Sequence, residues 1–189
     1  GHMLQACPIS CIQRPETGGE LQYANLSKAP SRKRILVAGG GSAGLKAASI
    51  AARRGHEVIL CEKSNALGGQ INLAQSLPGR AEFGGITVNL QKELSKTAAR
   101  LHLNCFVNLD VIENIALDVV ISATGATPYR AQIDGADDAR VVNAWQVLQG
   151  QTNVGGRVVI ADWRCDWVGL GLAELLVKQG RHVCLAVNG

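Results

Sequence analysis

A glycine-rich stretch near the start of the regular part of the sequence has the spacing of a phosphate-binding loop. Residues 34–63 read RILVAGGGSAGLKAASIAARRGHEVILCEK, with GGGSAG between a β-branched run and an apolar-periodic helix pattern. In such a loop Gly39 permits a tight turn, Gly41 leaves the backbone open to a pyrophosphate, and Gly44 lets the helix lie close to the strand. The pattern therefore predicts a site for a phosphorylated ligand at the start of a helix.

An acidic residue ends the next expected strand. Glu62 follows Gly41 by 21 residues, the position from which a carboxylate accepts hydrogen bonds from an adenosine ribose. A carboxylate here favours a free 2′-hydroxyl because a 2′-phosphate would meet its charge, and the neighbouring Lys63 weakens that inference only slightly. Together these features predict an adenine dinucleotide or ADP. The alternative is a glycine-rich turn that binds no ligand.

A second strand-to-helix joint lacks the small residues of the first. Residues 156–176 read GRVVIADWRCDWVGLGLAELL, and Trp163, Arg164 and Trp167 place bulk where a pyrophosphate needs bare backbone. We interpret this joint as a nucleotide fold without its nucleotide. Two alternatives stay open: the tryptophans cap an interface with a missing domain, or Cys165 is a nucleophile.

The sequence assigns no catalytic residue. Cys165 has no histidine base nearby in the sequence, and the histidines other than His2 begin expected strands, where surface positions are typical. Gly169 and Gly171 fall inside the expected helix of the second joint, where we expect them to permit close helix packing.

Strands and helices alternate along the chain after Ser31. The patterns predict strands at 34–39, 57–62, 102–107, 117–122, near 140–143, 157–161 and 182–187, a loop at 67–80, and helices at 42–54, 83–100, 143–149 and 168–179. Such alternation implies crossover connections and parallel pairing. The expected fold class is α/β: a Rossmann-like parallel sheet with flanking helices, followed by the start of a second, incomplete Rossmann-like unit.

These patterns divide the chain into four parts. We expect a tag remnant, an irregular lead-in, a Rossmann-like domain that binds an adenine dinucleotide or ADP, and a partial second nucleotide-type domain, at residues 1–3, 4–33, 34–150 and 151–189 respectively. Two parallel strands make a poor independent domain. We therefore expect a piece of a longer protein, or a sheet that another chain completes.

The composition narrows the functional classes. The net charge is +4, aromatic residues make up 4%, and the chain has no long basic stripe, so we expect no nucleic-acid partner. It has no apolar run of roughly 18 residues, so we expect a soluble protein without a membrane partner. Six scattered cysteines indicate a reduced, cytoplasmic protein, in which Cys61, Cys105 and Cys184 serve as small apolar side chains.

Further motifs resemble a known family. The segments LGGQINLAQSLPGR (67–80) and VVISATGATP (119–128), and the order GGGSAG, CEK, GGQ, ATGATP, resemble the C-terminal nucleotide-binding region of one group of flavoproteins. That group, the old-yellow-enzyme-type NADH:flavin oxidoreductases, includes 2,4-dienoyl-CoA reductase, trimethylamine dehydrogenase and histamine dehydrogenase. Within it the sequence looks closest to demethylases of N-methylated amino acids. The resemblance covers roughly residues 11–189.

The resemblance implies a cofactor and a missing part. It places Gly69, Gln70 and the turn Ala123-Thr124-Gly125 beside the cofactor, although a simple turn and a strand-end hydroxyl would also account for these residues. In the family a flavin-bearing barrel precedes this region and carries the substrate chemistry. The resemblance therefore implies FMN in the parent enzyme and a catalytic barrel as a missing domain or partner chain.

The segment CIQRPETGG (11–19) resembles the end of the family's four-cysteine iron–sulfur loop. Cys11 falls on a ligand position, but Gln5, Pro8 and Ala24 stand at the other three and Cys7 is out of register. A cluster normally requires four thiolates. We therefore expect no iron–sulfur cluster in this chain.

The leading hypothesis is a dinucleotide-binding part of a multidomain flavin-dependent oxidoreductase, of demethylase, dehydrogenase or enoyl-reductase type, that is inactive in isolation. FAD is the first choice because GGQINLA resembles the FAD-binding reductase. ADP is the alternative because ADWRCDW resembles the ADP-binding dehydrogenases, and it implies a non-catalytic module that docks the missing barrel. A third possibility is an empty fold. The expected cofactor-binding residues are Gly39, Gly41, Ser42, Ala43, Gly44, Glu62, Lys63, Gly69, Gln70, Ala123, Thr124 and Gly125.

Overall fold

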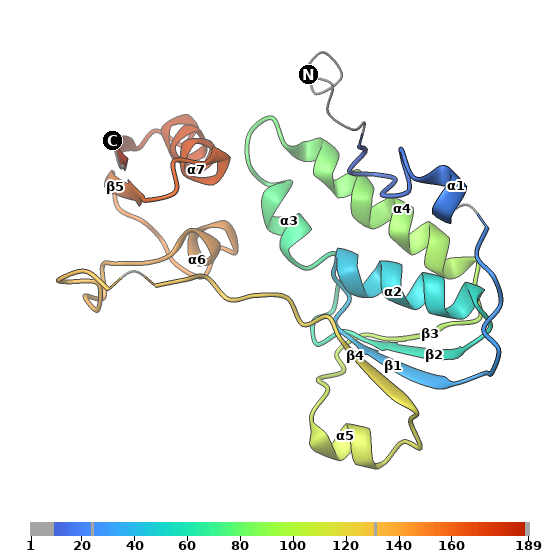
Figure 1. Cartoon of the computed structure of the whole chain (residues 1–189). Helices are drawn as coiled ribbons and strands as arrows, with labels where there is room; N and C mark the ends of the chain where they lie inside the picture. The colour runs from blue at the N-terminus through green and yellow to red at the C-terminus, as the bar shows by residue number, and fades with distance from the viewer. Residues whose placement is uncertain (1–9, 24, 131, 188–189) are drawn as a thin grey trace. The chain divides into compact units, whose positions relative to one another are not determined.

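The computed structural model describes residues 10–23, 25–130 and 132–187 (Figure 1). The chain forms two compact units. The first combines the residues up to 71 with 84–125, and the second combines 72–83 with the residues from 126 onward. The domain boundary at residue 150 that the sequence suggests stays a prediction.

A four-stranded parallel sheet organises the first unit, in the order β3-β2-β1-β4. Its strands are β1 (Arg34–Ala38), β2 (Glu57–Cys61), β3 (Arg100–His102) and β4 (Val119–Ser122). Leu36 in β1 lies opposite Ile59 of β2 and Val120 of β4. The chain moves outward from β1 through β2 to β3 and then returns to the other side of β1. The topological switch point, where α/β folds bind ligands, is therefore between β1 and β4.

Helices cover one face of this sheet (Figure 1). They are α2 (Ser42–Arg53) and α4 (Gly84–Ser95). Their apolar side chains pack on alternate residues of β1 and β2 in a core of Ile35, Val37, Leu45, Ala48, Ala51, Val58, Leu60, Leu90 and Leu94. Burial of both faces explains why β1 and β2 are nearly continuous apolar runs.

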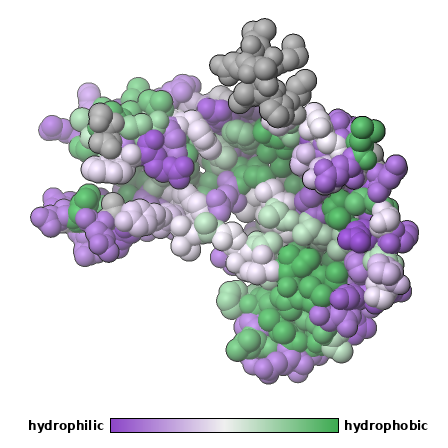
Figure 2. Space-filling view, viewed as in Figure 1, coloured by the Kyte–Doolittle hydropathy of each residue, from purple (hydrophilic) through white to green (hydrophobic). Residues whose placement is uncertain are grey.

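The opposite face of the sheet is covered by the segment between β3 and β4, which includes α5 (Leu109–Glu113). Leu36, Ile59 and Cys61 are buried there against partly buried side chains from 105–117. Figure 2 shows hydrophobic side chains gathered at the β4 and α5 end of the unit, where Phe106, Leu109 and Val120 are exposed.

The lead-in, expected to be irregular, packs on the first unit and contains a short helix, α1 (Glu20–Tyr23). The ammonium group of Lys46 in α2 lies 2.7 Å from a Glu16 carboxylate oxygen and 3.0 Å from one of Glu93 in α4. The amide of Asn89 donates to the Gln13 amide oxygen at 2.6 Å. These contacts join the lead-in to both helices.

The chain passes from the first unit to the second through α3 (Gln70–Ala74), and η2 (Ala81–Phe83) belongs to the second. The remaining elements of the second unit are α6 (Ala144–Leu148), β5 (Arg157–Asp162), α7 (Trp167–Lys178) and β6 (His182–Val187). Strands β5 and β6 pair in parallel, with Val159 opposite Cys184. Leu77, Leu172 and Leu176 are buried together at the centre of this unit.

The structure confirms the expected α/β class, with a Rossmann-like sheet followed by a second, smaller unit. The strand expected at 102–107 is instead β3 at 100–102, because Asn104 adopts a left-handed conformation (φ 53°) that ends the strand. The helix expected at 83–100 ends at Ser95, and the loop expected at 67–80 contains α3.

No strand forms at 140–143, within the part of the chain that the structure describes. Asp138 accepts a hydrogen bond from the Arg140 N–H at 2.8 Å, which bends the chain. Asn143 then caps α6 in a capping box with Gln146. Local side-chain hydrogen bonds therefore outweigh the strand propensity of the valine pair between them. Among the described helices, none has the length and apolar character that a bilayer crossing requires.

Candidate functional site

Two glycines hold the start of α2 against the end of β1. Gly39 has φ +110°, and a Cβ added there would lie 2.3 Å from the Ala123 carbonyl oxygen. A Cβ on Gly44 would lie 1.8 Å from the Gly39 carbonyl oxygen. Neither distance can accommodate a side chain, so both positions require glycine for the fold itself.

Gly41 has a different environment. It has an ordinary backbone conformation (φ −73°, ψ −176°), and a Cβ added to it would meet no atom within 4 Å. Gly41 is also the N-cap of α2, which begins without a side-chain cap. The first N–H groups of a helix have no partner within the helix, and the helix dipole favours an anion there. The open space beside Gly41 suits a phosphate.

Glu62 lies directly behind the glycine-rich loop, 7% exposed. One carboxylate oxygen accepts the Gly40 N–H at 2.6 Å, and the other accepts the Ser64 N–H at 2.8 Å and the Ser64 hydroxyl at 2.7 Å. Burial alone would raise the pKa of Glu62, but the hydrogen bonds from Ser64 and Gly40 outweigh it and leave this pKa below its ordinary value. The carboxylate is therefore ionised at neutral pH and fixes the loop.

The other expected site segments lie beside this loop. The Gly68 N–H donates to the Gly40 carbonyl at 2.9 Å, and a Cβ on Gly69 would lie 3.3 Å from the Gly41 Cα. A Cβ on Gly125 would lie 3.2 Å from the Gln70 amide nitrogen. The segments 68–70 and 123–125 therefore meet at the carboxyl ends of β1 and β4.

The structure thus brings the expected residues to one end of the sheet. Exposed members are Ser42, Ala43, Lys63, Gly69, Gln70, Thr124 and Gly125. The sequence motifs did not point to Gly40, Gly68 and Ser64, which hold Glu62 and the neighbouring loop in place. The signal for Gly40 was its place as the middle glycine of the GGG run: a Cβ there would lie 2.4 Å from the Leu67 side chain.

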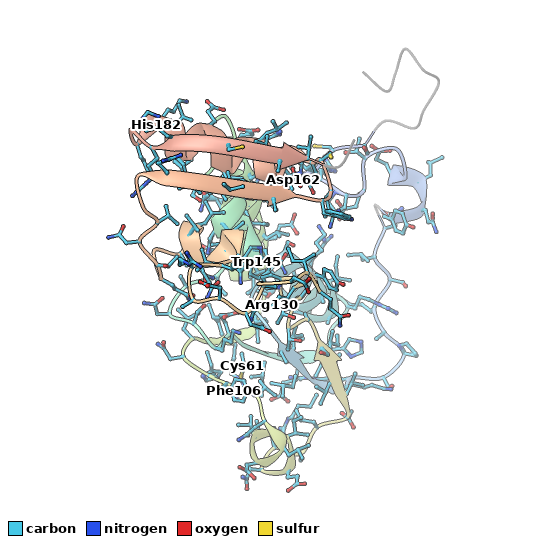
Figure 3. The ribbon with its side chains drawn as sticks, turned by 90° about the vertical axis from the view of Figure 1, so that its left-hand side faces the viewer. Cys61, Phe106, Arg130, Trp145, Asp162 and His182 are labelled. Atoms are coloured by element: carbon cyan, nitrogen blue, oxygen red, sulfur yellow. The ribbon has the colours of Figure 1, made fainter. Side chains whose placement is uncertain are left out.

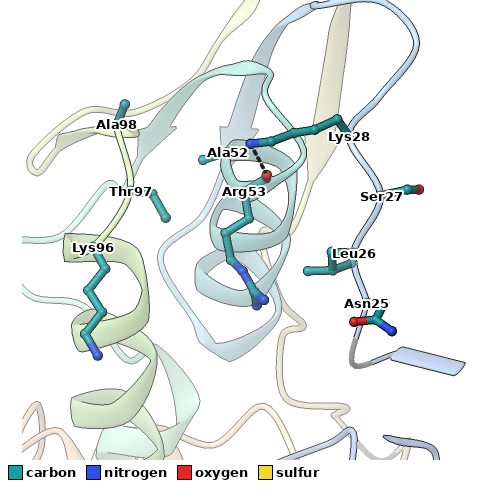
Figure 4. Close-up of a pocket in the computed structure, with 9 residues that line it drawn as sticks. All are labelled: Asn25, Leu26, Ser27, Lys28, Ala52, Arg53, Lys96, Thr97 and Ala98. Atoms are coloured by element: carbon teal, nitrogen blue, oxygen red, sulfur yellow. Dashed lines mark hydrogen bonds between the residues drawn. The ribbon is translucent and has the colours of Figure 1, made fainter. Parts of the chain in front are cut away.

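An open groove of about 730 Å³ lies elsewhere in the first unit (Figure 4). It is lined by the segments 25–28 and 96–98 together with Ala52 and Arg53 at the carboxyl end of α2. The Lys28 ammonium donates to the Arg53 carbonyl at 3.1 Å. Because α2 begins at the glycine-rich loop and ends here, the groove is at the opposite end of that helix from the candidate site.

At the second strand-to-helix joint, aspartate side chains of the chain itself accept the backbone N–H groups. One Asp162 carboxylate oxygen accepts the N–H groups of Arg164 and Cys165, both at 3.1 Å, and Asp166 caps α7 by accepting the Val168 N–H at 2.9 Å. Figure 3 labels Asp162 at the end of β5. Carboxylates of the chain therefore occupy the N–H groups that a phosphate would need.

The glycines of α7 have separate roles. A Cβ on Gly169 would lie 2.2 Å from the other Asp162 carboxylate oxygen, so this glycine makes room for the carboxylate rather than for another helix. A Cβ on Gly171 would lie 3.3 Å from a Leu77 methyl carbon, which agrees with the close packing expected there.

Aromatic residues surround this joint within the second unit. The Trp167 ring lies 5.9 Å from the Phe83 ring, and the Arg80 guanidinium lies 5.0 Å from the Trp167 ring centre. These contacts leave Trp167 40% exposed, whereas Trp163 is 74% exposed. An exposed tryptophan is consistent with the interface interpretation and does not test it.

The expected absence of an iron–sulfur cluster stays a prediction. Cys11 is described and exposed, whereas Gln5, Cys7, Pro8 and Ala24 lie outside the described residues.

Comparisons with known proteins agree with this geometry. The sequence profile of the family described as pyridine nucleotide-disulphide oxidoreductase matches residues 33–160. An N,N-dimethylglycine/sarcosine dehydrogenase of Chromohalobacter salexigens is 36% identical over 188 residues, which cover 95% of this chain and 27% of that protein. A Rhizobium meliloti protein named "Probable N-methylproline demethylase" is 35% identical over 174 residues, covering 92% of this chain and 26% of that protein.

A solved structure extends the comparison. The structure of 2-naphthoyl-CoA reductase superposes with a TM-score of 0.89 at 30% identity, covering 97% of this chain and 28% of that one. The expected resemblance to N-methylated amino acid demethylases and related flavoproteins is confirmed. The chain spans little more than a quarter of the length of these relatives.

We predict that alanine has a large effect on stability at one glycine of the GGGSAG segment and a small effect at another. Gly44→Ala should lower the free energy of unfolding by about 3 kcal/mol or more, because its methyl group would collide with backbone. Gly41→Ala should change it by less than about 0.5 kcal/mol, because its methyl group meets open space. Urea unfolding of both proteins measures the difference, and equal stabilities would contradict the described loop geometry.

We also predict a pH-dependent role for Glu62. Because its pKa is lowered on folding, the ionised carboxylate stabilises the folded chain above its ordinary pKa of about 4.5, and this contribution is lost as pH falls through the folded pKa. Glu62→Gln should cost about 1–3 kcal/mol at pH 7 and progressively less below about pH 4.5. Urea unfolding at several pH values tests this, with the exposed Glu113→Gln as control. A cost that does not change with pH would contradict the assignment.

Proposed function

Because the chain belongs to the pyridine nucleotide-disulphide oxidoreductase family, we propose that the site at the carboxyl ends of β1 and β4 binds FAD as part of a flavin-dependent oxidoreductase. The family match and the relatives support a flavin cofactor. The observation that carries the proposal is the open space beside Gly41 at the uncapped start of α2. The neighbouring Gly39 and Gly44, which the fold itself requires, hold this helix start in place.

Each part of the site has a role in this proposal. Gly41 and the first turn of α2, with Ser42 and Ala43, hold the pyrophosphate through backbone N–H groups. Glu62 accepts a hydrogen bond from an adenosine ribose hydroxyl. A carboxylate has about four acceptor positions, and the three hydrogen bonds from Gly40 and Ser64 leave about one available. Lys63 lies beside it on the exposed side.

The remaining segments would line the rest of an extended dinucleotide. Gly69 and Gln70 approach from one side, and Ala123, Thr124 and Gly125 from the other. Apart from Gln70 these residues have small side chains or none, which permits close contact with a ligand. Bound FAD supplies two-electron redox chemistry at its isoalloxazine ring. The residues of this chain bind and orient the cofactor, and we assign none of them a reaction with substrate.

The whole protein would carry the substrate chemistry elsewhere. Two relatives are named for N-methylated amino acids and one solved structure for an aromatic acyl-CoA thioester. We propose that a barrel domain or partner chain, with FMN, oxidises an N-methylated amine or reduces an enoyl thioester, and that this chain alone turns over neither. A cytoplasmic location belongs to the same proposal.

A structural ADP is the second candidate for the ligand. The second joint favours ADP. There Asp162 and Asp166 accept the backbone N–H groups that would bind a phosphate, so this joint offers no site for a second nucleotide. On this alternative the chain is a non-catalytic module, and the exposed Trp163 contacts the catalytic domain.

The deciding experiment identifies the ligand that co-purifies with the protein. The purified chain is denatured, and the supernatant is analysed by visible absorption and by mass spectrometry. Yellow FAD is the expected result. Colourless ADP would replace FAD with the structural alternative, and a protein that contains no nucleotide and binds neither FAD nor ADP on titration would overturn both.

We predict that Gly41→Val abolishes nucleotide binding without unfolding the protein. The valine side chain has room in the fold but would occupy the path of the pyrophosphate. Equilibrium dialysis with FAD and ADP measures the loss, and circular dichroism checks the fold. Trp163→Ala is the matched control and should leave affinity unchanged. Unaltered binding by the valine variant would remove the site from this loop.

A further inference from the structure

Two cysteines meet at the carboxyl end of β2, in the sheet face that α5 and its flanking segments cover. The Cys105 Sγ lies 2.9 Å from the Cys61 Sγ. Cys61 is the last residue of β2 and is 3% exposed, whereas Cys105 is half-buried. Phe106, the residue that follows Cys105, is exposed; Figure 3 labels it and Cys61. The pair therefore joins a buried cysteine to a partly exposed one.

The backbone holds these cysteines together independently of their sulfur atoms. The Gly39 N–H donates to the Cys61 carbonyl at 2.8 Å, and the Cys105 N–H donates to the Glu62 carbonyl at 2.9 Å. The left-handed Asn104 directs the chain back toward β2, with its N–H bonded to the Ser64 carbonyl at 3.0 Å. A disulfide has an S–S distance of about 2.0 Å, so its formation here needs a small side-chain movement.

We propose that Cys61 and Cys105 are a redox-active pair that forms a reversible disulfide when the protein meets a low-molecular-weight disulfide such as oxidised glutathione. The proposal is independent of the nucleotide assignment, because neither sulfur is among the atoms proposed to contact the ligand. It also differs from the sequence-based expectation, in which both residues were small apolar side chains.

The exchange proceeds in two balanced steps. The Cys105 thiolate attacks one sulfur of oxidised glutathione; the glutathione S–S bond breaks, a Cys105–glutathione disulfide forms, and the leaving thiolate takes a proton from water. Cys61 then loses its proton and attacks the Cys105 sulfur, which releases the second glutathione as a thiol. Two protein thiols are oxidised by two electrons and one glutathione disulfide is reduced to two thiols.

The environment of the pair supports this order. Burial, the hydrogen bond with Cys105 and the charge of the Cys105 thiolate raise the pKa of Cys61 to about 12. The first attack is therefore assigned to Cys105, which is partly exposed, whereas Cys61 is buried and hard to ionise. Once Cys105 carries glutathione, its charge and its hydrogen bond no longer raise the pKa of Cys61. Cys61 then ionises more easily than it does in the pair of free thiols, which favours the second step.

The bond would tie β2 to the segment after β3 next to a residue of the candidate site. Cys61 precedes Glu62, and its carbonyl already fixes Gly39. Closing the chain between residues 61 and 105 restricts the unfolded ensemble, so the oxidised protein should unfold about 5 °C or more above the reduced one.

The test uses the full chain with Cys7, Cys11, Cys165 and Cys184 replaced by serine, so that only the proposed pair remains. Of these, Cys11, Cys165 and Cys184 are exposed and Cys7 lies outside the described residues. After native incubation with oxidised glutathione, we expect an intact mass lower by two hydrogens, no retained glutathione, and a Cys61–Cys105 cross-linked peptide on non-reducing digestion. Dithiothreitol should restore both thiols.

Single variants in this background separate the steps. Cys61→Ser should stop at one stable glutathione adduct on Cys105, and Cys105→Ser should leave Cys61 unmodified. Circular dichroism and thermal unfolding check their folds, and the peptide map of the two-cysteine protein decides the proposal if either variant fails to fold. A lasting adduct in the two-cysteine protein, thiols that stay open to alkylation, or a disulfide that forms only in urea would overturn it.

Discussion

The close approach of α2 to the end of β1 is the constraint on which the first unit depends. Gly44 lies against the Gly39 carbonyl, and Gly39 lies against Ala123, so these two contacts join β1, α2 and the end of β4. Any side chain at either glycine would separate these elements. Because they cannot separate, the start of α2 is fixed beside the switch point of the sheet, and Gly41 is left with open space.

The two strand-to-helix joints show how the same topology can have different chemistry. In the first, the Glu62 carboxylate accepts the Gly40 N–H, and the start of α2 has no side-chain cap. In the second, Asp162 and Asp166 bind the N–H groups around the start of α7. A phosphate there would have to displace one carboxylate and approach both charges, so the difference between the joints is electrostatic as well as steric.

The glycine loop and Glu62 were predictable because fixed spacing within one βαβ unit determines their positions. The strand at 102–107 was misplaced because the apolar run continues past Asn104, and only the tertiary hydrogen bonds to Ser64 and Glu62 reveal that the chain turns there. The contact between Cys61 and Cys105 depends on the same turn. Nothing local to the sequence indicates that 72–83 packs with the later part of the chain, because its partner Leu172 is far away in the sequence.

That packing has an evolutionary consequence. The second unit is not encoded by one continuous stretch, since Leu77 and Phe83 come from a segment interrupting the first unit. Suppose that recombination exchanged only the residues after 125. The hybrid protein would then keep its old residue 77 in the core of a second unit that comes from the other parent. Productive exchange must either carry two separate gene segments or preserve the Leu77 contacts. Diversification of this unit by point substitution, as at the tryptophan-bearing joint, is therefore the easier route.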